Sequence, residues 1–438
     1  IMKTDMNVHK ILGRHMLADG MDLVMDLDRS HGSWIVDQKD GNEYLDLYTM
    51  YASQAIGYNH PKMVEISDEL TRAAIQKPIC SDIYTVEMAR FLEIFARVAI
   101  PAYLPHAFFI EGGALAVENA LKAAFDWKSR LNQTSGRDDT PGNMIIHFKE
   151  AFHGRSGYTL SLTNTFNPDK TKFFPKFNWP RIDNPKLQFP VDAAEVQRVS
   201  ETEARALDQV KQAIHQYGDR VAGLIIEPIQ SEGGDNHFRA EFMQALRDLC
   251  SENRIIFILD EVQTGIGLTG RFWAHEHHGV QPDIISFGKK TQVCGMLAGP
   301  IMDEVQDNVF QRSMRIGSTF GGNLVDMVRC KRILEIIESE RLVDAADRQG
   351  SYLLAKLQDL QSRFADRISN VRGQGLLCAF DLPDPEHKKQ FVEKCARARV
   401  LVVGCGPKSI RFRPHLNIST TEIDHGMKVL ADVLADMA

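Results

Sequence analysis

The sequence lacks long apolar segments, although 44% of its 438 residues are hydrophobic. No run approaches the roughly 20 consecutive apolar residues that a membrane-spanning helix requires, so we expect no membrane association. The first residues, Ile1-Met2-Lys3-Thr4-Asp5, are not followed by the apolar core of a secretory signal. These two absences predict a cytoplasmic protein.

Closely spaced cysteines are also missing. The seven cysteines are scattered along the chain, and none forms a Cys-x-x-Cys pair. An odd number of irregularly spaced cysteines disfavours a disulfide framework or a zinc site and is typical of reduced thiols. The segment His275-Glu276-His277-His278 lacks the His-Glu-x-x-His spacing of zinc enzymes. We therefore expect no metal site.

An excess of positive charge is absent as well. The net charge is −7, which argues against a general nucleic-acid binder. There is no evident repeat or low-complexity tract. A chain of this length exceeds one small core, so two or more domains are expected.

What the sequence does contain is a series of short, continuous apolar runs that alternate with helical patterns beyond about residue 61. Runs that are continuous rather than alternating are typical of strands covered on both faces, as in a mostly parallel sheet. The strands are expected at 107–110, 144–148, 221–226, 255–259 and 284–287, and the helices include 116–131 and 240–253. The pattern predicts an α/β protein whose central sheet is covered by helices.

The two ends of the chain have a different pattern. A hairpin around Asp40-Gly41 is expected from 34–36 and 44–48, and a helix over 325–340 precedes short strands at 376–380 and 410–412. We predict a large domain over 61–323 and a smaller α+β domain built from 1–60 and 324–438. Two loops interrupt the large domain, an exposed one at 132–143 and a longer one at 164–190. The second contains five prolines and is long enough to have a role at a site.

Two charged residues stand at the ends of neighbouring predicted strands. Asp260 directly follows the run 255–259, and Lys289 follows 284–287 after Gly288. An acid that keeps a pyridine nitrogen protonated and an amine that reacts with an aldehyde are what pyridoxal phosphate needs. Gln263 is close enough in sequence to Asp260 to reach the phenolic oxygen of that ring. The pattern alone does not separate Lys289 from its neighbour Lys290.

Two further turns follow predicted strands. Glu111-Gly112-Gly113-Ala114-Leu115 opens the helix after 107–110, and small residues at a helix N-terminus are suited to binding phosphate. Phe152-His153-Gly154-Arg155 follows the strand 144–148. Its aromatic ring could stack on a planar cofactor, and Arg155 could bind a carboxylate through two parallel hydrogen bonds.

A third group of charges lies farther along the chain. Arg411 and Arg413 would point to opposite faces of an extended segment, so one of them is expected to face inward. Glu232, after the strand 221–226, is a candidate counter-ion.

One glycine motif suggests a different function. Gly265-Ile266-Gly267-Leu268-Thr269-Gly270 matches the dinucleotide-binding pattern, and Asp283 lies downstream. In that fold the acid ends the next strand, whereas Asp283 precedes its strand. A nicotinamide or flavin site is therefore not expected.

These residues together resemble the class III aminotransferases, which are fold-type I pyridoxal phosphate enzymes. The segments from Leu259 to Gly265 and from Phe287 to Lys289 carry the class resemblance. The segments 111–119, 152–158 and 288–295 are similar to the lysine 6-aminotransferase subgroup. Gly112-Gly113-Ala114 and Leu268 depart from the Ser-Gly-Thr turn and the arginine common in the class, and both departures agree with that subgroup.

The resemblance implies a role for each candidate residue. Lys289 would bind the cofactor covalently, Asp260 its ring nitrogen, Gln263 its phenolic oxygen, and Phe152, with His153 beside it, the ring face. Gly113 and Ala114 would bind the phosphate, assisted by Ser318 and Thr319 of the neighbouring subunit of a homodimer. Arg155, Glu232 and Arg411 would bind substrate, and Glu227 would support the site.

The implied reaction transfers the ε-amino group of L-lysine to 2-oxoglutarate. Its products are 2-aminoadipate 6-semialdehyde and L-glutamate. Another ω-aminotransferase, acting on ornithine, 4-aminobutyrate or a diamine, is the nearest alternative. A pyridoxal phosphate mutase or decarboxylase has the same fold, and a cofactor-binding regulator would need a DNA-binding module for which no residues remain.

Overall fold

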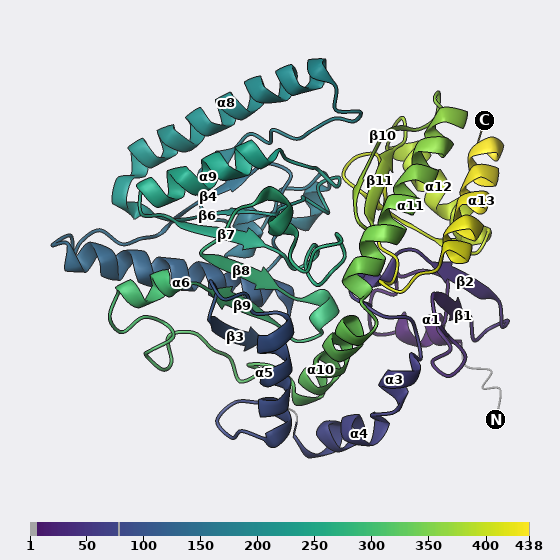
Figure 1. Ribbon diagram of the computed structural model, residues 1–438, viewed down its shortest axis with the longest axis horizontal. Coiled ribbons are helices and arrows are strands. Elements are labelled where there is room, and N and C mark those ends of the chain that lie inside the picture. The colour runs from purple at the N-terminus through teal and green to yellow at the C-terminus, as the bar shows by residue number, and fades with distance from the viewer. Residues whose placement is uncertain (1–6, 78, 438) are drawn as a thin grey trace.

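The computed structural model describes residues 7–77 and 79–437, so the segment Ile1 to Asp5 inspected for a signal lies outside it. A seven-stranded sheet with helices on both faces forms one end of the molecule, and two smaller sheets lie at the other (Figure 1). Within the described residues, no helix is long and apolar enough to cross a bilayer.

The large sheet has the strand order β3-β9-β8-β7-β6-β4-β5. These strands are β3 (His106–Ile110), β4 (Met144–Phe148), β5 (Arg181–Ile182), β6 (Val221–Ile226), β7 (Ile256–Asp260), β8 (Ile284–Phe287) and β9 (Cys294–Ala298). The strands from β8 to β5 are parallel to one another, whereas β9 runs antiparallel to both of its neighbours. The prediction of a mostly parallel central sheet is confirmed, and β5 and β9 are additions to it.

Helices cover both faces because successive residues of a strand point to opposite sides. In β7, Ile256 and Ile258 pack in the core formed with α6 (Gly113–Thr134). Phe257 and Leu259 belong to the opposite core, which includes side chains of α5 (Val86–Val98) and α9 (Ala240–Glu252). The same alternation places Asp260, the last residue of β7, on the side of α6. The long helix α8 (Ala193–Tyr217) also packs on α9.

The two ends of the chain share the smaller part of the molecule. The hairpin β1 (Trp34–Val36) and β2 (Glu43–Asp46) forms around Gly41, which has a φ of 79°. β2 pairs in parallel with β12 (Val400–Leu401), so the first and last segments lie in one sheet. The other sheet has the order β10-β11-β14-β13, and its strands are β10 (Ser369–Gln374), β11 (Leu377–Asp381), β13 (Val403–Cys405) and β14 (Ser409–Phe412).

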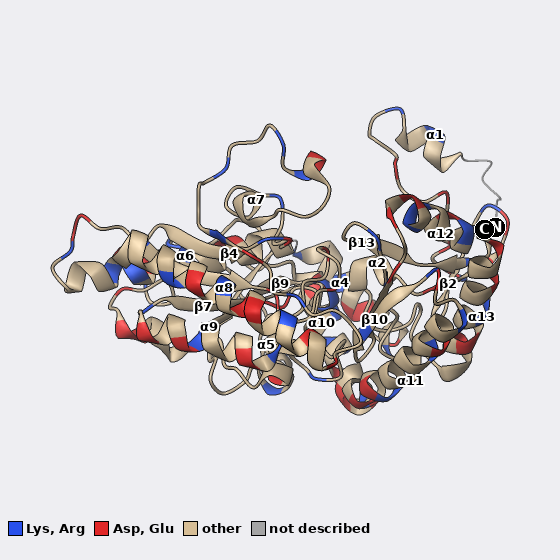
Figure 2. Cartoon of the chain, turned by 90° about the horizontal axis from the view of Figure 1, so that it is seen from above, with Lys and Arg blue, Asp and Glu red and all other residues tan. Residues whose placement is uncertain are grey.

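Helix α10 (Leu324–Ser339) connects the two parts. It packs against α5 of the larger part, and its N-terminus is capped by Asn323, whose side chain accepts a hydrogen bond from the amide of Val325. The helices α11 (Leu342–Arg363), α12 (Pro385–Arg397) and α13 (Thr420–Asp436) follow it. Figure 2 shows them at the end of the molecule opposite α6, α8 and α9. The boundaries at 60/61 and 323/324 stay a prediction.

The loops differ in part from the expectation. Helix α6 continues to Thr134, and the amide of Asn132 is buried and donates to the carbonyls of Thr140 and Asp219, both at 2.8 Å. The prediction of an exposed loop is therefore wrong at Asn132. The segment 164–190 contains β5 and the short helix η1 (Pro168–Lys170). The remaining short elements are α1 (Val8–Leu12), α2 (Thr49–Ala52), α3 (Pro61–Val64), α4 (Ser67–Gln76), α7 (Thr159–Leu162), η2 (Gly218–Arg220), η3 (Ala274–His278), η4 (Lys289–Thr291) and η5 (Pro300–Glu304).

Candidate active site

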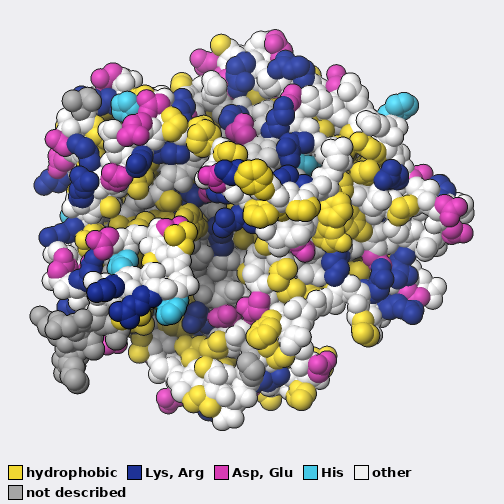
Figure 3. Space-filling view, turned by 180° about the vertical axis from the view of Figure 1, so that it is seen from behind, with side chains coloured by type: hydrophobic (Ala, Val, Ile, Leu, Met, Phe, Trp, Pro, Cys, Tyr) yellow, Lys and Arg dark blue, Asp and Glu magenta, His cyan; other side chains and the backbone are white. Residues whose placement is uncertain are grey.

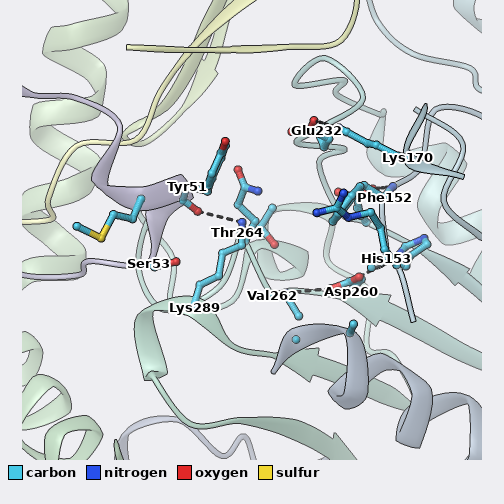
Figure 4. A pocket seen from close by; sticks show the side chains of 17 residues that line it. Tyr51, Ser53, Phe152, His153, Lys170, Glu232, Asp260, Val262, Thr264 and Lys289 are labelled. Carbon is cyan, nitrogen blue, oxygen red and sulfur yellow. Dashed lines mark hydrogen bonds and ion pairs between the residues drawn. The ribbon is translucent and has the colours of Figure 1, made fainter. Parts of the chain in front are cut away.

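A cavity of about 490 Å³ lies at the carboxyl ends of β4, β6, β7 and β8 (Figure 4). Parallel strands deliver their last residues to one edge of the sheet, which is where α/β proteins usually bind ligands. The cavity is lined by Gly113, Ala114, Phe152, His153, Arg155, Glu232, Asp260, Gln263 and Lys289 among others. With Glu227, the structure thus brings together ten residues that the sequence singles out from five separate segments.

Lys289 reaches the cavity from the end of β8. Its backbone has a φ of 54°, a left-handed conformation that residues other than glycine seldom adopt and that is frequent at functional sites. Burial, together with the nearby cations Arg411 and Arg413, lowers the pKa of Lys289 to about 7. A large fraction of this amine is therefore neutral, and hence nucleophilic, near neutral pH.

Lys290 has a different environment. Its side chain is almost fully buried, and its Nζ donates to the carbonyl of Gln263 at 2.9 Å. It does not line the cavity, whereas Lys289 does. The geometry therefore favours Lys289 as the reactive amine, a choice that strand pattern alone leaves open.

The carbonyl that holds Lys289 comes from an unusual turn. Nζ of Lys289 donates to the carbonyl of Tyr51 at 3.0 Å. Tyr51 belongs to α2, whose four residues all have positive φ values between 46° and 67°. A left-handed turn costs about 1–2 kcal/mol per residue outside glycine, so its surroundings must stabilise it. The turn brings a segment of the N-terminal region onto the cavity, and sequence pattern does not reveal it.

Asp260 is buried at the end of β7 and held on both oxygens. Oδ2 lies 2.7 Å from Nδ1 of His153, while Oδ1 accepts from the amide of Val262 at 3.1 Å and from the hydroxyl of Ser286 at 3.2 Å. Burial opposes protonation of His153, but its hydrogen bond to Asp260 and the charges of Asp260 and Glu227 raise the pKa of the imidazole. The contact with His153 therefore fixes the position of the Asp260 carboxylate and favours its charged form.

The N-terminus of α6 forms one wall of the cavity. Gly112 precedes the helix without a capping side chain, which leaves the first backbone N–H groups available to an anion. A Cβ on Gly113 would lie 2.9 Å from Cγ1 of Val262, closer than real Cβ contacts. Glycine is therefore needed for the helix to start this close to the turn after β7.

Phe152 is positioned by a buried carboxylate. Its backbone amide donates to Oε1 of Glu227 at 3.0 Å, and Oε2 of Glu227 accepts from the amide of Ser231 at 3.1 Å. Burial raises the pKa of Glu227 to about 7. Glu227 thus connects the turns after β4 and β6 and fixes the ring of Phe152 at the cavity.

Glu232 binds two cations. Its Oε2 lies 2.6 Å from Nη2 of Arg411, which is almost fully buried, and its Oε1 forms an ion pair with Nζ of Lys170 from η1. Burial alone would raise the pKa of Glu232, but Arg411 and Lys170 outweigh it and lower that pKa. The expected pairing of Glu232 with Arg411 is present, whereas Lys170 is a cavity residue that the sequence analysis does not name.

Arg411 is buried, as expected for one of the two arginines, but Arg413 is buried too, so the expectation that they point to opposite faces does not separate them. β14 ends at Phe412, and Arg413 turns towards Asp235, whose Oδ1 lies 2.5 Å from its Nη2. Nε of Arg413 donates to Oε1 of Gln263 at 2.9 Å. The strand alternation does not extend past Phe412, and the second arginine is used to orient Gln263.

The remaining predicted residues are exposed. Arg155 lines the cavity, and among the described residues no carboxylate forms an ion pair with it. Ser318 and Thr319 do not line the cavity of their own chain, and the hydroxyl of Ser81 donates to the carbonyl of Thr319 at 3.0 Å. Their predicted role in a neighbouring subunit stays a prediction.

The cavity fits pyridoxal phosphate. It offers a helix N-terminus for a phosphate, a buried carboxylate for a protonated ring nitrogen, an aromatic side chain, and an amine of lowered pKa for an aldehyde. Lys289 and Asp260 flank Val262 in Figure 4, so the amine and the carboxylate reach the same space from adjacent strands.

Comparison with known proteins agrees with this geometry. The family model "Aminotransferase class-III" matches residues 16–434. L-lysine-epsilon aminotransferase of Mycobacterium tuberculosis is 51% identical over 430 residues, covering 98% of this chain and 95% of its own, and that of Streptomyces clavuligerus is 48% identical over 436 residues, covering 99% and 95%. The structure of lysine aminotransferase from M. tuberculosis in the internal aldimine form superimposes with a TM-score of 0.96 at 51% identity, covering 98% of this chain and 99% of that one. The chain belongs to the class III aminotransferases, which depend on pyridoxal phosphate.

Proposed function

We propose that the protein is an L-lysine 6-aminotransferase. It transfers the ε-amino group of L-lysine to 2-oxoglutarate and produces 2-aminoadipate 6-semialdehyde and L-glutamate. The observation that carries this proposal is the ion pair of Arg411 with Glu232, because Glu232 lines the same cavity as Lys289 and Arg155, and Arg155 has no carboxylate partner among the described residues. The identity of about half the residues to L-lysine-epsilon aminotransferases supports the choice of donor.

The cavity residues divide the work. Bound pyridoxal phosphate supplies an electron-accepting ring. Asp260, held by His153, keeps the ring nitrogen protonated. Lys289 would take and return the proton at the ε-carbon of the substrate, because its lowered pKa lets it act as both base and acid near neutral pH. Arg155, which lines the same cavity, binds the α-carboxylate of lysine.

The two substrates present different groups next to the reacting atom. Lysine has no carboxylate there, whereas 2-oxoglutarate has one adjacent to its carbonyl. An unpaired Arg411 would favour α-amino acids, so Glu232 masks it for lysine and leaves it for the 2-oxo acid. The ion pair at 2.6 Å is the masked state.

Glu232→Ala tests this selectivity. We expect the variant to impair the lysine half-reaction more than the glutamate half-reaction. Without Glu232, Arg411 is free to bind a carboxylate next to the reacting carbon, which glutamate has and the ε-end of lysine lacks. Single-turnover absorption changes of the cofactor measure the two halves separately. Equal losses in both would contradict the masking role of Glu232.

The donor itself is tested by product analysis. Purified protein incubated with lysine and 2-oxoglutarate should release glutamate and trappable semialdehyde in equal amounts. Faster turnover of ornithine, 4-aminobutyrate or a diamine would identify that amine, and not lysine, as the donor. Release of carbon dioxide without glutamate would indicate a decarboxylase.

We also infer a homodimer with sites at the subunit interface, located in the cytoplasm. Apolar side chains gather around a hollow on the face shown in Figure 3. Large exposed apolar side chains lie near the exposed Thr319. Met314 and Phe320 are close to it in sequence, and Ile83 and Tyr84 follow Ser81, whose hydroxyl donates to the carbonyl of Thr319. Such residues are typical of surfaces that a partner covers. All seven cysteines are buried and free, in keeping with a reducing compartment.

A further inference from the structure

Glu232 stands between two cations rather than one. Arg411 holds one of its oxygens and Lys170 the other, and the side chains of Glu232 and Lys170 are both 22% exposed. A carboxylate this poorly solvated is costly to leave without a cationic partner. When the carboxylate of a 2-oxo acid binds Arg411, Glu232 must separate from Arg411. Lys170 already contacts the other oxygen of Glu232 and can keep this carboxylate paired.

Lys170 has anchors of its own. Its Nζ lies 5.5 Å from the centre of the Phe152 ring, within the range of a cation–π interaction. The turn that carries it is fixed by Asn167, whose side chain accepts from the amide of Asp169 at 3.0 Å. Lys170 therefore remains at the rim of the cavity when Glu232 changes partner, as its place beside Phe152 in Figure 4 illustrates.

Within the ion-paired group of Glu232, Arg411 and Lys170, Lys170 supplies the charge that balances an incoming carboxylate. Glu232, Arg411 and Lys170 sum to +1 (one negative and two positive) in the structure. An incoming carboxylate brings this group to zero, with two cations facing two carboxylates. Without Lys170 the same event would leave one guanidinium facing two carboxylates and a net charge of −1. Placing like charges together at short range in a partly buried site opposes binding.

We propose that Lys170 is a specificity-determining residue that receives Glu232 when the 2-oxo acid displaces it from Arg411. Lys170 acts through Glu232 and is a positioning residue, since the α-carboxylate of the substrate binds Arg411. This inference rests on the proposed masking of Arg411 by Glu232. It also gives a function to the proline-rich segment 164–190, which brings Lys170 to the cavity.

Binding of glutarate, a dicarboxylate that cannot react, tests the inference without an amine donor. Titration calorimetry on the cofactor-loaded protein should show that Lys170→Met weakens glutarate by at least about fivefold, whereas Lys170→Arg, which keeps the cation, stays within about twofold of the unchanged protein. Lys172→Met is the matched control, because Lys172 lies in the same turn but pairs with the exposed Asp169. Unchanged glutarate affinity in Lys170→Met, or an equal loss in Lys172→Met, would overturn the proposal.

A second comparison separates an action through Glu232 from direct contact with the ligand. In a Glu232→Gln background, Lys170→Met should have little further effect on glutarate, because no displaced carboxylate remains. An undiminished fivefold loss in that background would mean that Lys170 binds the ligand directly and would overturn the proposal. In half-reactions, Lys170→Met should raise the KM for 2-oxoglutarate and leave the lysine half-reaction nearly unchanged, the reverse of Glu232→Ala. If the unchanged protein does not use lysine, the proposed donor fails while the glutarate comparison still stands.

Discussion

The pKa of a single amine determines how the cavity captures its cofactor. Burial, followed by the nearby cations Arg411 and Arg413, outweighs the opposing charges of Glu232 and Asp260, so the pKa of Lys289 falls from 10.5 to about 7. At neutral pH this shift increases the neutral fraction of the amine by about three orders of magnitude.

The rate at which the apoprotein binds pyridoxal phosphate should therefore rise with pH through about 7 and then level off. Only the neutral amine attacks the aldehyde, and the neutral form increases as pH rises through the pKa. Arg411→Gln removes a positive neighbour, so the rise should move to higher pH. Stopped-flow absorption measures the rate, and the reaction of the same aldehyde with N-acetyl-lysine corrects for the titration of the cofactor itself. A rate that continues to climb into the range of ordinary lysines would show that Lys289 is not perturbed.

Sequence pattern predicted the residues that stand at strand ends and missed those placed by loops. Asp260 and Lys289 follow continuous apolar runs, and the parallel sheet brings them to one edge. Lys170 and Asp235 meet their partners Glu232 and Arg413 only through loop geometry. Lys289 and Lys290 are adjacent, so only the turn of the backbone after Gly288 decides which of them reaches the cavity.

At the scale of secondary structure elements, the start of α6 is held close to the turn after β7. Continuous apolar runs predicted five strands because burial on both faces leaves a clear pattern. β9 escaped prediction because Cys294-Gly295-Met296-Leu297-Ala298 mixes small residues, and its antiparallel direction depends on the short connection from β8. Gly295 itself is required by packing, since a Cβ there would lie 2.1 Å from the carbonyl oxygen of Phe108.

The close approach of α6 to the turn after β7 can be tested at Gly113. Gly113→Ala places a Cβ against Val262 and should displace the helix N-terminus, weakening pyridoxal phosphate by at least about tenfold, which corresponds to about 1.4 kcal/mol. Adding Val262→Ala should recover most of the affinity by removing the collision. Gly20→Ala serves as the control, because no atom lies within 4 Å of a Cβ there. Equilibrium titration of the apoproteins measures each affinity, and wild-type affinity in Gly113→Ala would contradict the phosphate-binding role of this helix end.

At the scale of the whole molecule, the site depends on segments far apart in the chain. The pairing of β2 with β12 holds the N-terminal turn containing Tyr51 beside the C-terminal strand that carries Arg411. The sequence suggested this union of 1–60 with 324–438 only from the change of pattern at the two ends, because strand pairing between distant segments leaves no local signal. Thr319 is exposed, so a segment of a second chain could contribute to the site in the same way.

Mixing two inactive variants tests whether Thr319 completes the site of a neighbouring subunit. Lys289→Ala removes the amine, and Thr319→Asp places a negative charge where a phosphate is expected. In a mixed dimer, one site would carry both changes and the other neither. Random exchange makes half of the dimers mixed, so the mixture should recover about a quarter of the wild-type activity. Lys289→Ala mixed with Asp260→Asn is the matched control, since both residues line the cavity of their own chain and every site of that mixture is impaired. Recovery no greater than in this control would mean that Thr319 does not act across a subunit interface, and the site would then have to bind the phosphate with the N-terminus of α6 alone.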